Sequence, residues 1–416
     1  MQRGSDGATA TPRREFATVL VLALGFGLVG IDRFLITTLF PVISKEFSLN
    51  YSDIGVISGA LSIAWGLAAL FAGNISDRIG RRPVLVAAML LFSMLIGASG
   101  LATGLMTLVA VRIVMGVADG SYTPASIAAT LHVSPYRRRG RNLGLQQMTS
   151  TLFGLGFAPL LVTALLHVIS WRWIFTLFVV PGFVLAYLAW VLIPPRDSAP
   201  RATDAAAGRR TLKGDFYAAI GNRNIRLLMG LMLVWLTCLV SISAFLPNYL
   251  LDYLHIGFDQ MGAVMSAIGF GSAAGTILLP WLSDRIGRRP VAMIAVAGAL
   301  AAIFLLSRCG PQVAPLFACT FVAMGCVMAG ITLTVGPICE ESVPLGLGAT
   351  ASGMVIAVGE LFGGGIAPIL VGRIAQRFGI EHMLWLPMAA LVVGLLVAFA
   401  VQETRGPNYA KPKSVC

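Results

Sequence analysis

The chain has 416 residues, of which 57% are apolar and 12% are charged, and its mean hydropathy is +0.84. Soluble domains carry about 25% charged residues, so the composition excludes a chain built mainly of soluble domains and predicts a membrane protein. The formal net charge of +12 invites a nucleic-acid partner, but the distribution of basic residues along the chain argues against one.

Apolar runs of about 20 residues, the length needed to span a bilayer, recur along the whole sequence. Residues 1–15 form a polar tail, and the first half, 16–193, holds six runs: 16–41, 54–75, 84–103, 105–131, 142–168 and 173–193. Residues 194–226 form a polar, basic linker. The second half, 227–402, holds six more runs: 227–250, 262–282, 291–307, 312–338, 347–372 and 383–401. Residues 403–416 form a polar tail. We therefore expect an all-α polytopic protein of twelve transmembrane helices in two six-helix halves.

The 30 Lys and Arg residues lie mainly in the tails, the linker and the loops that share their side of the membrane. Basic loops favour the cytoplasm, so we expect both termini to be cytoplasmic in a plasma membrane, the inner membrane of a bacterium. Two arginines, Arg33 and Arg112, lie within predicted helices. Five basic residues fall on the external side: Lys45, Arg172, Arg308, Arg373 and Arg377. This pattern predicts contact with the lipid bilayer and no nucleic-acid partner.

Two segments recur half a chain length apart and in the same order. Ser76–Val84 is repeated letter for letter as Ser283–Val291, and Phe153–Leu161 matches Phe362–Leu370 at six of nine positions. The repeats predict two structurally related halves, which is an architecture of secondary transporters.

Cofactor and metal signatures are absent from the sequence. None of the six cysteines forms a CxxC pair, the four histidines form no HExxH pattern, and no P-loop is present. We expect no catalytic site, no metal site, no structural disulfide, no cofactor and no ATP-driven step.

The repeated polar loop resembles the signature loop of the major facilitator superfamily. Its first copy supplies Gly73, Asp77, Arg78, Gly80, Arg81 and Arg82, and its second copy supplies Asp284, Arg285, Gly287, Arg288 and Arg289, with Pro280 in place of Gly73. Leu108, Arg112, Gly116 and Gly120 resemble a second signature of the superfamily. The resemblance implies that the loop aspartate docks on a neighbouring helix end while the arginines brace the cytoplasmic face in one conformational state.

Further motifs resemble the anion:cation symporter family within that superfamily. They are Asp32-Arg33 with Pro41 and Lys45-Glu46-Phe47, Arg112 with Asp119-Gly120, Pro159, and Trp171–Phe175. The resemblance implies proton-coupled uptake of a small organic anion, with Arg33 or Arg112 for the substrate's carboxylate and Asp32 and Asp119 for protons. Asp119 stands where family members usually have Glu, so its carboxyl group is one methylene shorter.

Charged residues deep in predicted helices point to a site. Asp32, Arg33, Arg112 and Asp119 lie in the first half and Glu360 in the second. Such residues are costly in lipid and normally face a cavity or a partner. Asp32 and Arg112 lie roughly 14 and 10 Å from the external helix ends, at about the same level, and an arginine fork suits a carboxylate. The alternative is salt-bridged packing in which Arg112 neutralises Asp32 or Asp119.

Three other polar residues are candidates for substrate contact. Glu360 either contacts the substrate or carries a proton, or it is a helix–helix hydrogen-bonding group, and Gln147 and Asn248 are candidates for substrate hydroxyls. Trp65 more often indicates packing than recognition.

Competing functions differ in sequence signals. A proton-driven drug exporter would carry Gly-Pro-x-x-Gly-Gly on the fifth helix, where this chain reads Ala158–Thr163 without the final glycine pair. Glu403-Thr404-Arg405-Gly406 resembles the end of sugar porters, which leaves a neutral sugar or polyol as an alternative substrate. We expect a monomeric transporter that is not an enzyme.

Overall fold

The computed structural model describes residues 12–135, 138–193, 212–344 and 347–404. All of the regular elements in these ranges are helical, and twelve helical stretches are long and apolar enough to cross a membrane. The predicted all-α polytopic fold is therefore confirmed.

The first half contains six spanning stretches. Four are single helices, α1 (Pro12–Phe47), α2 (Tyr51–Ile79), α3 (Arg81–Gly100) and α4 (Leu105–Val133). The fifth joins α5 (Arg139–Thr151), η2 (Leu152–Phe157) and α6 (Ala158–Leu166), and the sixth joins α7 (Trp171–Leu177) and α8 (Val179–Leu192). Helix α1 exceeds the predicted run 16–41 because it continues past Pro41 to Phe47.

The second half repeats this plan. Its stretches are α10 (Arg223–Asn248) with η3 (Tyr249–Tyr253), α11 (Phe258–Ile286), α12 (Arg288–Leu306), α13 (Val313–Val335) with α14 (Pro337–Ser342), α15 (Gly348–Val358) with η4 (Gly359–Ile366) and α16 (Ala367–Phe378), and η5 (Ile380–Leu384) with α17 (Trp385–Ala400).

The second half starts before residue 227, the first residue after the predicted linker. Residues Leu212–Gly221 form a short helix, α9, and the rest of the linker up to residue 211 lies outside the described residues. Helix α10 begins at Arg223 because the Asn222 side chain accepts hydrogen bonds from the backbone N–H groups of Asn224 and Ile225, which caps the helix.

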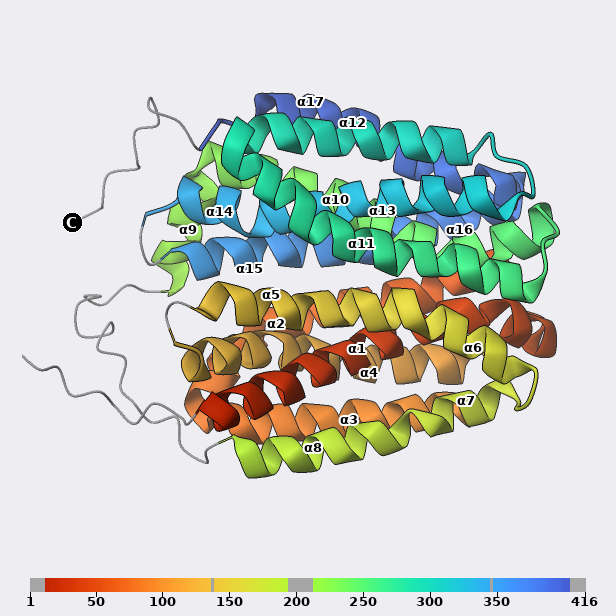
Figure 1. Cartoon of the computed structure of the whole chain (residues 1–416), viewed down its shortest axis with the longest axis horizontal. Coiled ribbons are helices and arrows are strands. Elements are labelled where there is room, and N and C mark those ends of the chain that lie inside the picture. The colour runs from red at the N-terminus through yellow and green to blue at the C-terminus, as the bar shows by residue number, and fades with distance from the viewer. Residues whose placement is uncertain (1–11, 136–137, 194–211, 345–346, 405–416) are drawn as a thin grey trace, which may run out of the picture.

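The two halves form two bundles that lie side by side (Figure 1). Helix α1 begins and α17 finishes at one end of the molecule, which we call the terminal end, and the opposite end is the distal end. The halves meet along two seams, where α2 contacts η4 and α16, and where α11 contacts η2 and α6.

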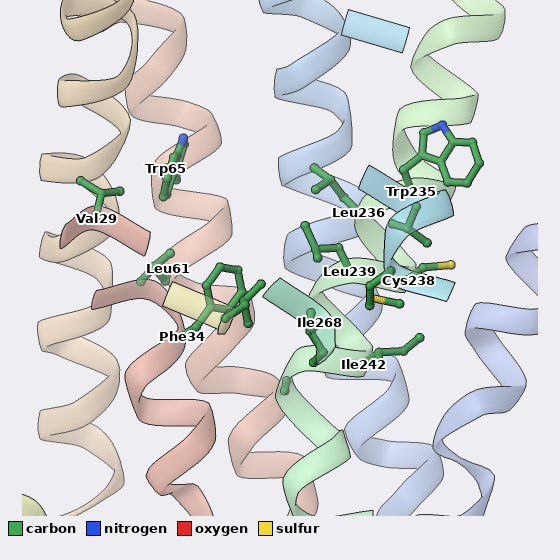
Figure 2. Packing of buried hydrophobic residues seen from close by; sticks show 14 of the residues in the cluster. Val29, Phe34, Leu61, Trp65, Trp235, Leu236, Cys238, Leu239, Ile242 and Ile268 are labelled. Atoms are coloured by element: carbon green, nitrogen blue, oxygen red, sulfur yellow. The ribbon is translucent and has the colours of Figure 1, made fainter. Parts of the chain in front are cut away.

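Buried apolar side chains fill each bundle. Phe34, Leu61 and Trp65 lie on the first-half side of the view in Figure 2, and Trp235 and Ile268 lie on the second-half side. Large apolar side chains on the outer surface, such as Leu396 at 70% exposure, suit contact with lipid tails.

Small residues bring helices together inside each half. Gly116 and Gly120 of α4 face the backbone of α2, where a Cβ on Gly120 would lie 2.6 Å from the Trp65 carbonyl oxygen. Gly271 and Gly275 of α11 face α13 in the same way. This small-xxx-small spacing drives helix association where lipid removes the hydrophobic force.

The repeated segments have the same backbone in both halves. Gly80 and Gly287 have φ values of 101° and 104°, a region that glycine adopts at little cost, and each separates two helices. The second repeat places a π-helical turn at matching positions, η2 and η4. The structure thus carries the internal duplication that the sequence indicates.

Polar contacts join the halves at the distal end. The Tyr51 hydroxyl donates to Asp252 Oδ2 over 3.0 Å, and the Tyr51 backbone N–H donates to Gln376 Oε1 over 3.1 Å. His167 Nε2 lies 2.9 Å from Asp259 Oδ1. These contacts hold α2 and α6 of the first half against the second half.

Candidate functional site

Arg33 and Glu360 form an ion pair between the two halves at mid-bundle. Arg33 Nη1 donates to Glu360 Oε1 over 3.0 Å, and Arg33 Nη2 donates to Glu360 Oε2 over 2.8 Å. The two side chains are 11% and 7% exposed. The two parallel bonds make this a bidentate pair, the strongest geometry for an arginine with a carboxylate. It links α1 to the π-turn η4.

Two residues of α2 fix the Arg33 guanidinium in place. The Ser62 hydroxyl accepts a bond from Arg33 Nη2 over 3.1 Å, and the Trp65 ring centroid lies 4.6 Å from Arg33 Cζ. A guanidinium over an indole face gains a cation–π attraction. Trp65, which the sequence favours as a packing residue, therefore also contacts the site.

Arg112 is buried inside the first half. It is 1% exposed, donates from Nη1 to the Asp32 backbone carbonyl over 2.7 Å, and lies 3.7 Å from Asp32 Oδ1. The prediction that Asp32 and Arg112 share a level is thus confirmed. Among the described residues, Arg112 Nε and Nη2 have no hydrogen-bond partner, so part of its donor fork is unused.

Asp32 and Asp119 form a buried acid pair. Both are 0% exposed, and no described donor bonds any of their four carboxyl oxygens. The two carboxyl groups lie near enough to each other to interact electrostatically. Two nearby carboxylates repel when both are ionised, so one proton on the pair stabilises this arrangement.

A small cavity lies between the two arginines. It has a volume of only about 10 Å³, which is room for a single water. Its polar lining consists of hydroxyl and guanidinium groups, from Arg33, Thr37, Ser58, Ser62, Arg112 and Ser243. Sequence reasoning missed Ser58 and Ser62, although their spacing of four places both on one face of α2.

Gln147 and Asn248 lie elsewhere. Gln147 is exposed on α5, while its buried neighbour Gln146 accepts a bond from Thr130. Asn248 donates to Asp252 Oδ2 over 2.9 Å near the distal end. In this conformation the described contacts of Arg33 and Glu360 include neither residue, and their role in substrate contact stays a prediction.

Asn248 instead lines a second, larger cavity at the distal end. This distal cavity has a volume of about 350 Å³. Its lining is largely polar and includes Ser44, Lys45, Tyr51, Asn248, Asp252 and Gln376. The bond between Tyr51 and Asp252 lies in its wall.

The second copy of the repeated loop forms a charged network at the terminal end. Arg288 donates to Asp284 over 2.9 Å and to Glu341 over 3.0 Å. The carboxylate docked on the helix end is Glu403, which accepts the backbone N–H groups of Arg288 and Arg289, both over 2.9 Å. A carboxylate is favourable at a helix N-terminus. Arg285 lies over the Trp281 ring at 3.9 Å.

The first copy is described only in part. Arg82 Cζ lies 4.0 Å from the Trp190 ring centroid, and Arg81 also has an interaction partner. The side chains of Asp77 and Arg78 lie outside the described residues, so the implied docking of Asp77 stays a prediction.

Comparison with known proteins gives consistent results. The model of the family described as Major Facilitator Superfamily matches residues 22–368 and 240–414. The chain is 25% identical over 408 residues to the gentisate transporter of Corynebacterium glutamicum, covering 94% of this chain and 89% of the relative. It is 26% identical over 395 residues to the sialic acid transporter NanX of Escherichia coli, covering 91% and 92%.

A solved structure shares the fold. It is a bacterial homolog of the human lysosomal transporter Spinster in an inward-facing, unoccupied conformation, with a TM-score of 0.77 at 17% identity, covering 94% of this chain and 97% of that one. The relatives are named as transporters, which agrees with the prediction that the chain is not an enzyme.

Proposed function

Because the chain belongs to the Major Facilitator Superfamily, we propose that it is a proton-coupled symporter that takes up a small organic anion by alternating access. The energy source is the proton gradient, and the transporter works as a monomer. The observation that carries the proposal is the mid-bundle site, where Arg33, which bonds Glu360 of the other half, follows Asp32 of the buried acid pair Asp32 and Asp119 in the chain.

Charge balance links the proton to the anion. Arg33, Arg112, Asp32, Asp119 and Glu360 leave one excess negative charge when all five are ionised, and a single proton on the acid pair neutralises it. A substrate carboxylate adds one negative charge to a site that must close without water. Unpaired charge in such a site is unfavourable, so each carboxylate that enters requires one further proton.

The two arginines have different tasks in this scheme. Arg33 presents a planar fork next to the Ser62 hydroxyl and the Trp65 face, which suits a carboxylate. Arg112 stays beside Asp32 within the first half, where its charge favours ionisation of the acids. Water that reaches the acid pair in one open state can then remove the proton.

The orientation follows from the positive-inside rule. The basic linker and tails belong in the cytoplasm, so the terminal end is cytoplasmic and the distal end is external, in the plasma membrane of a bacterium. In this orientation the contacts of Tyr51 with Asp252 and Gln376 close the path from outside to the site.

The relatives' names support an acidic substrate, because gentisate and sialic acid are acids. The paired buried charges support it independently, since a neutral polyol needs hydrogen bonds but no cationic fork. A drug exporter and a polyol symporter remain as outcomes of the test.

The test is uptake into proteoliposomes under an inward proton gradient. Radiolabelled gentisate, sialic acid, galactonate and a neutral polyol serve as probes. We expect uphill uptake of at least one acid, collapse of that uptake with a protonophore, and no requirement for sodium. Undiminished accumulation with the protonophore, a strict sodium requirement, or uptake of the polyol alone would contradict proton-coupled anion symport.

A further inference from the structure

The bond between Arg33 and Glu360 has the geometry expected for a bound substrate carboxylate. Both Glu360 oxygens accept bonds from the two terminal nitrogens of Arg33, over 3.0 and 2.8 Å. Arg33 also donates to Ser62, and its planar face is covered by Trp65. The guanidinium edge that would receive a substrate is therefore already occupied by a carboxylate of the protein.

The cavity beside Arg33 has no room for a substrate. The adjoining cavity has a volume of about 10 Å³, enough for a water molecule and too small for a carboxylic acid. A substrate carboxylate can reach the fork of Arg33 only if Glu360 leaves it.

The local backbone is built to bring Glu360 to this position. A Cβ on Gly364 would lie 2.8 Å from Glu360 Oε2 and 3.1 Å from Ser62 Oγ, so a glycine there gives the carboxylate its room. Glu360 lies in the π-turn η4. Such turns are rare and frequently occur at functional sites.

We propose that Glu360 is an internal stand-in for the substrate's carboxylate, which pairs with Arg33 in the empty carrier and is displaced when substrate binds. This inference rests on the proposed anion transport. Its physical reason is that the empty carrier must also close, and a buried Arg33 without a partner is unfavourable. Because Glu360 belongs to the opposite half, the same bond draws the halves together when no substrate is present.

Two consequences distinguish this role from others. When the Glu360 carboxylate is removed, substrate carboxylates bind Arg33 more tightly because they no longer compete with it. The empty carrier then closes and returns to its starting conformation more slowly. If Glu360 carried the transported proton instead, replacing it would remove the pH dependence of substrate binding. A structural hydrogen bond would affect folding and leave the affinity for carboxylates unchanged.

The binding experiment uses purified wild type, Glu360→Gln and the matched control Glu340→Gln, whose exposed side chain lies on α14. Dissociation constants are measured for gentisate, sialic acid, galactonate and benzoate at several pH values. We expect Glu360→Gln to bind at least one of these acids roughly tenfold more tightly, since charge-assisted hydrogen bonds are worth about this much, with an unchanged pH dependence. Glu340→Gln should match the wild type. Equal or weaker binding of all four acids by Glu360→Gln, or loss of its pH dependence, overturns the proposal.

A second experiment requires no substrate. Ser44 lines the distal cavity, so a Ser44→Cys reporter, in a chain without its native cysteines, measures opening at that end. We expect an impermeant maleimide to label the reporter faster in Glu360→Gln than in the Glu340→Gln control, and likewise in Gly364→Ala, which displaces the carboxylate without changing its charge. Equal labelling of the Glu360→Gln, Gly364→Ala and control reporters overturns the stand-in even if wild-type uptake is proton-driven. Absence of proton-driven uptake in the wild type would refute the proposed function and leave these two results intact.

Discussion

Gly372 permits a close approach of the halves at the distal end, so replacing it should open that end. It lies in α16 against the start of α2, where Ser52 Oγ is 3.5 Å from the Gly372 carbonyl oxygen. A Cβ at this position would lie 2.7 Å from the Tyr51 carbonyl oxygen and 3.1 Å from Ser52 Cα. Both are backbone atoms, so relief requires α2 and α16 to separate.

The size of the effect follows from the overlap. Inserting a methyl group into a packed contact costs about 1–3 kcal/mol, and 1.4 kcal/mol corresponds to a tenfold change in an equilibrium constant. The cost applies only while the halves touch at this end. Gly372→Ala should therefore shift the equilibrium toward the distal-open conformation by about 5- to 150-fold.

The matched control is Gly353→Ala. Gly353 belongs to the same spanning stretch, and a Cβ there would meet nothing within 4 Å. Both changes add the same helix propensity, about 1 kcal/mol, so a difference between them reports the contact with α2 alone.

The assay is labelling of the Ser44→Cys reporter in intact cells with an impermeant maleimide. We expect faster labelling in Gly372→Ala and the wild-type rate in Gly353→Ala, together with slower net uptake in Gly372→Ala. If the two variants label and transport alike, the contact between α16 and α2 does not control access to the distal cavity.

Three further predictions concern the charged site. Arg33→Lys keeps the charge but loses the planar fork, so the dissociation constant for a transported acid should rise about tenfold or more, a result that wild-type affinity would contradict. Arg112→Lys loses the bond to the Asp32 carbonyl, so we expect it to lower the Tm of the protein more than Arg33→Lys does. Equal Tm values for the two variants would show that this bond contributes little. Asp32→Asn and Asp119→Asn each fix one acid of the pair in its neutral form, so the variant that lacks the acid binding the transported proton should lose uphill uptake and keep counterflow exchange. Full uphill uptake in both would refute the assignment of these acids, and a joint fall of expression and exchange in Asp119→Asn would mark a structural role.

The fold could be predicted because hydropathy and duplication both act over long stretches of sequence. Twelve apolar runs give twelve spanning stretches, and the repeated loops give equivalent turns at Gly80 and Gly287. The ends were less predictable, since hydropathy does not register caps. Helix α10 begins at its Asn222 cap, before the apolar run, and α1 continues through charged residues to Phe47.

The site was predictable where one helix or one neighbouring pair determines it. Counting residues from helix ends places Asp32 and Arg112 at about the same level, and the structure shows them in contact. The pairing of Arg33 with Glu360 spans two halves, and it depends on how η4 lies against α2, which spacing does not reveal. Likewise, a polar residue within an apolar run can face several ways. Gln147 is exposed and Asn248 lines the distal cavity for this reason.

The sequence left open which arginine binds the substrate, and the contacts of the two side chains divide the roles. Alternating access requires the halves to separate, which breaks bonds between them and preserves bonds within each. The Arg33–Glu360 pair belongs to the first kind and the Arg112–Asp32 pair to the second. A residue whose partner must change with each cycle suits a ligand that comes and goes, whereas a residue with a permanent partner suits a fixed electrostatic role. We therefore propose that the substrate's carboxylate binds Arg33 and that Arg112 controls the acid pair.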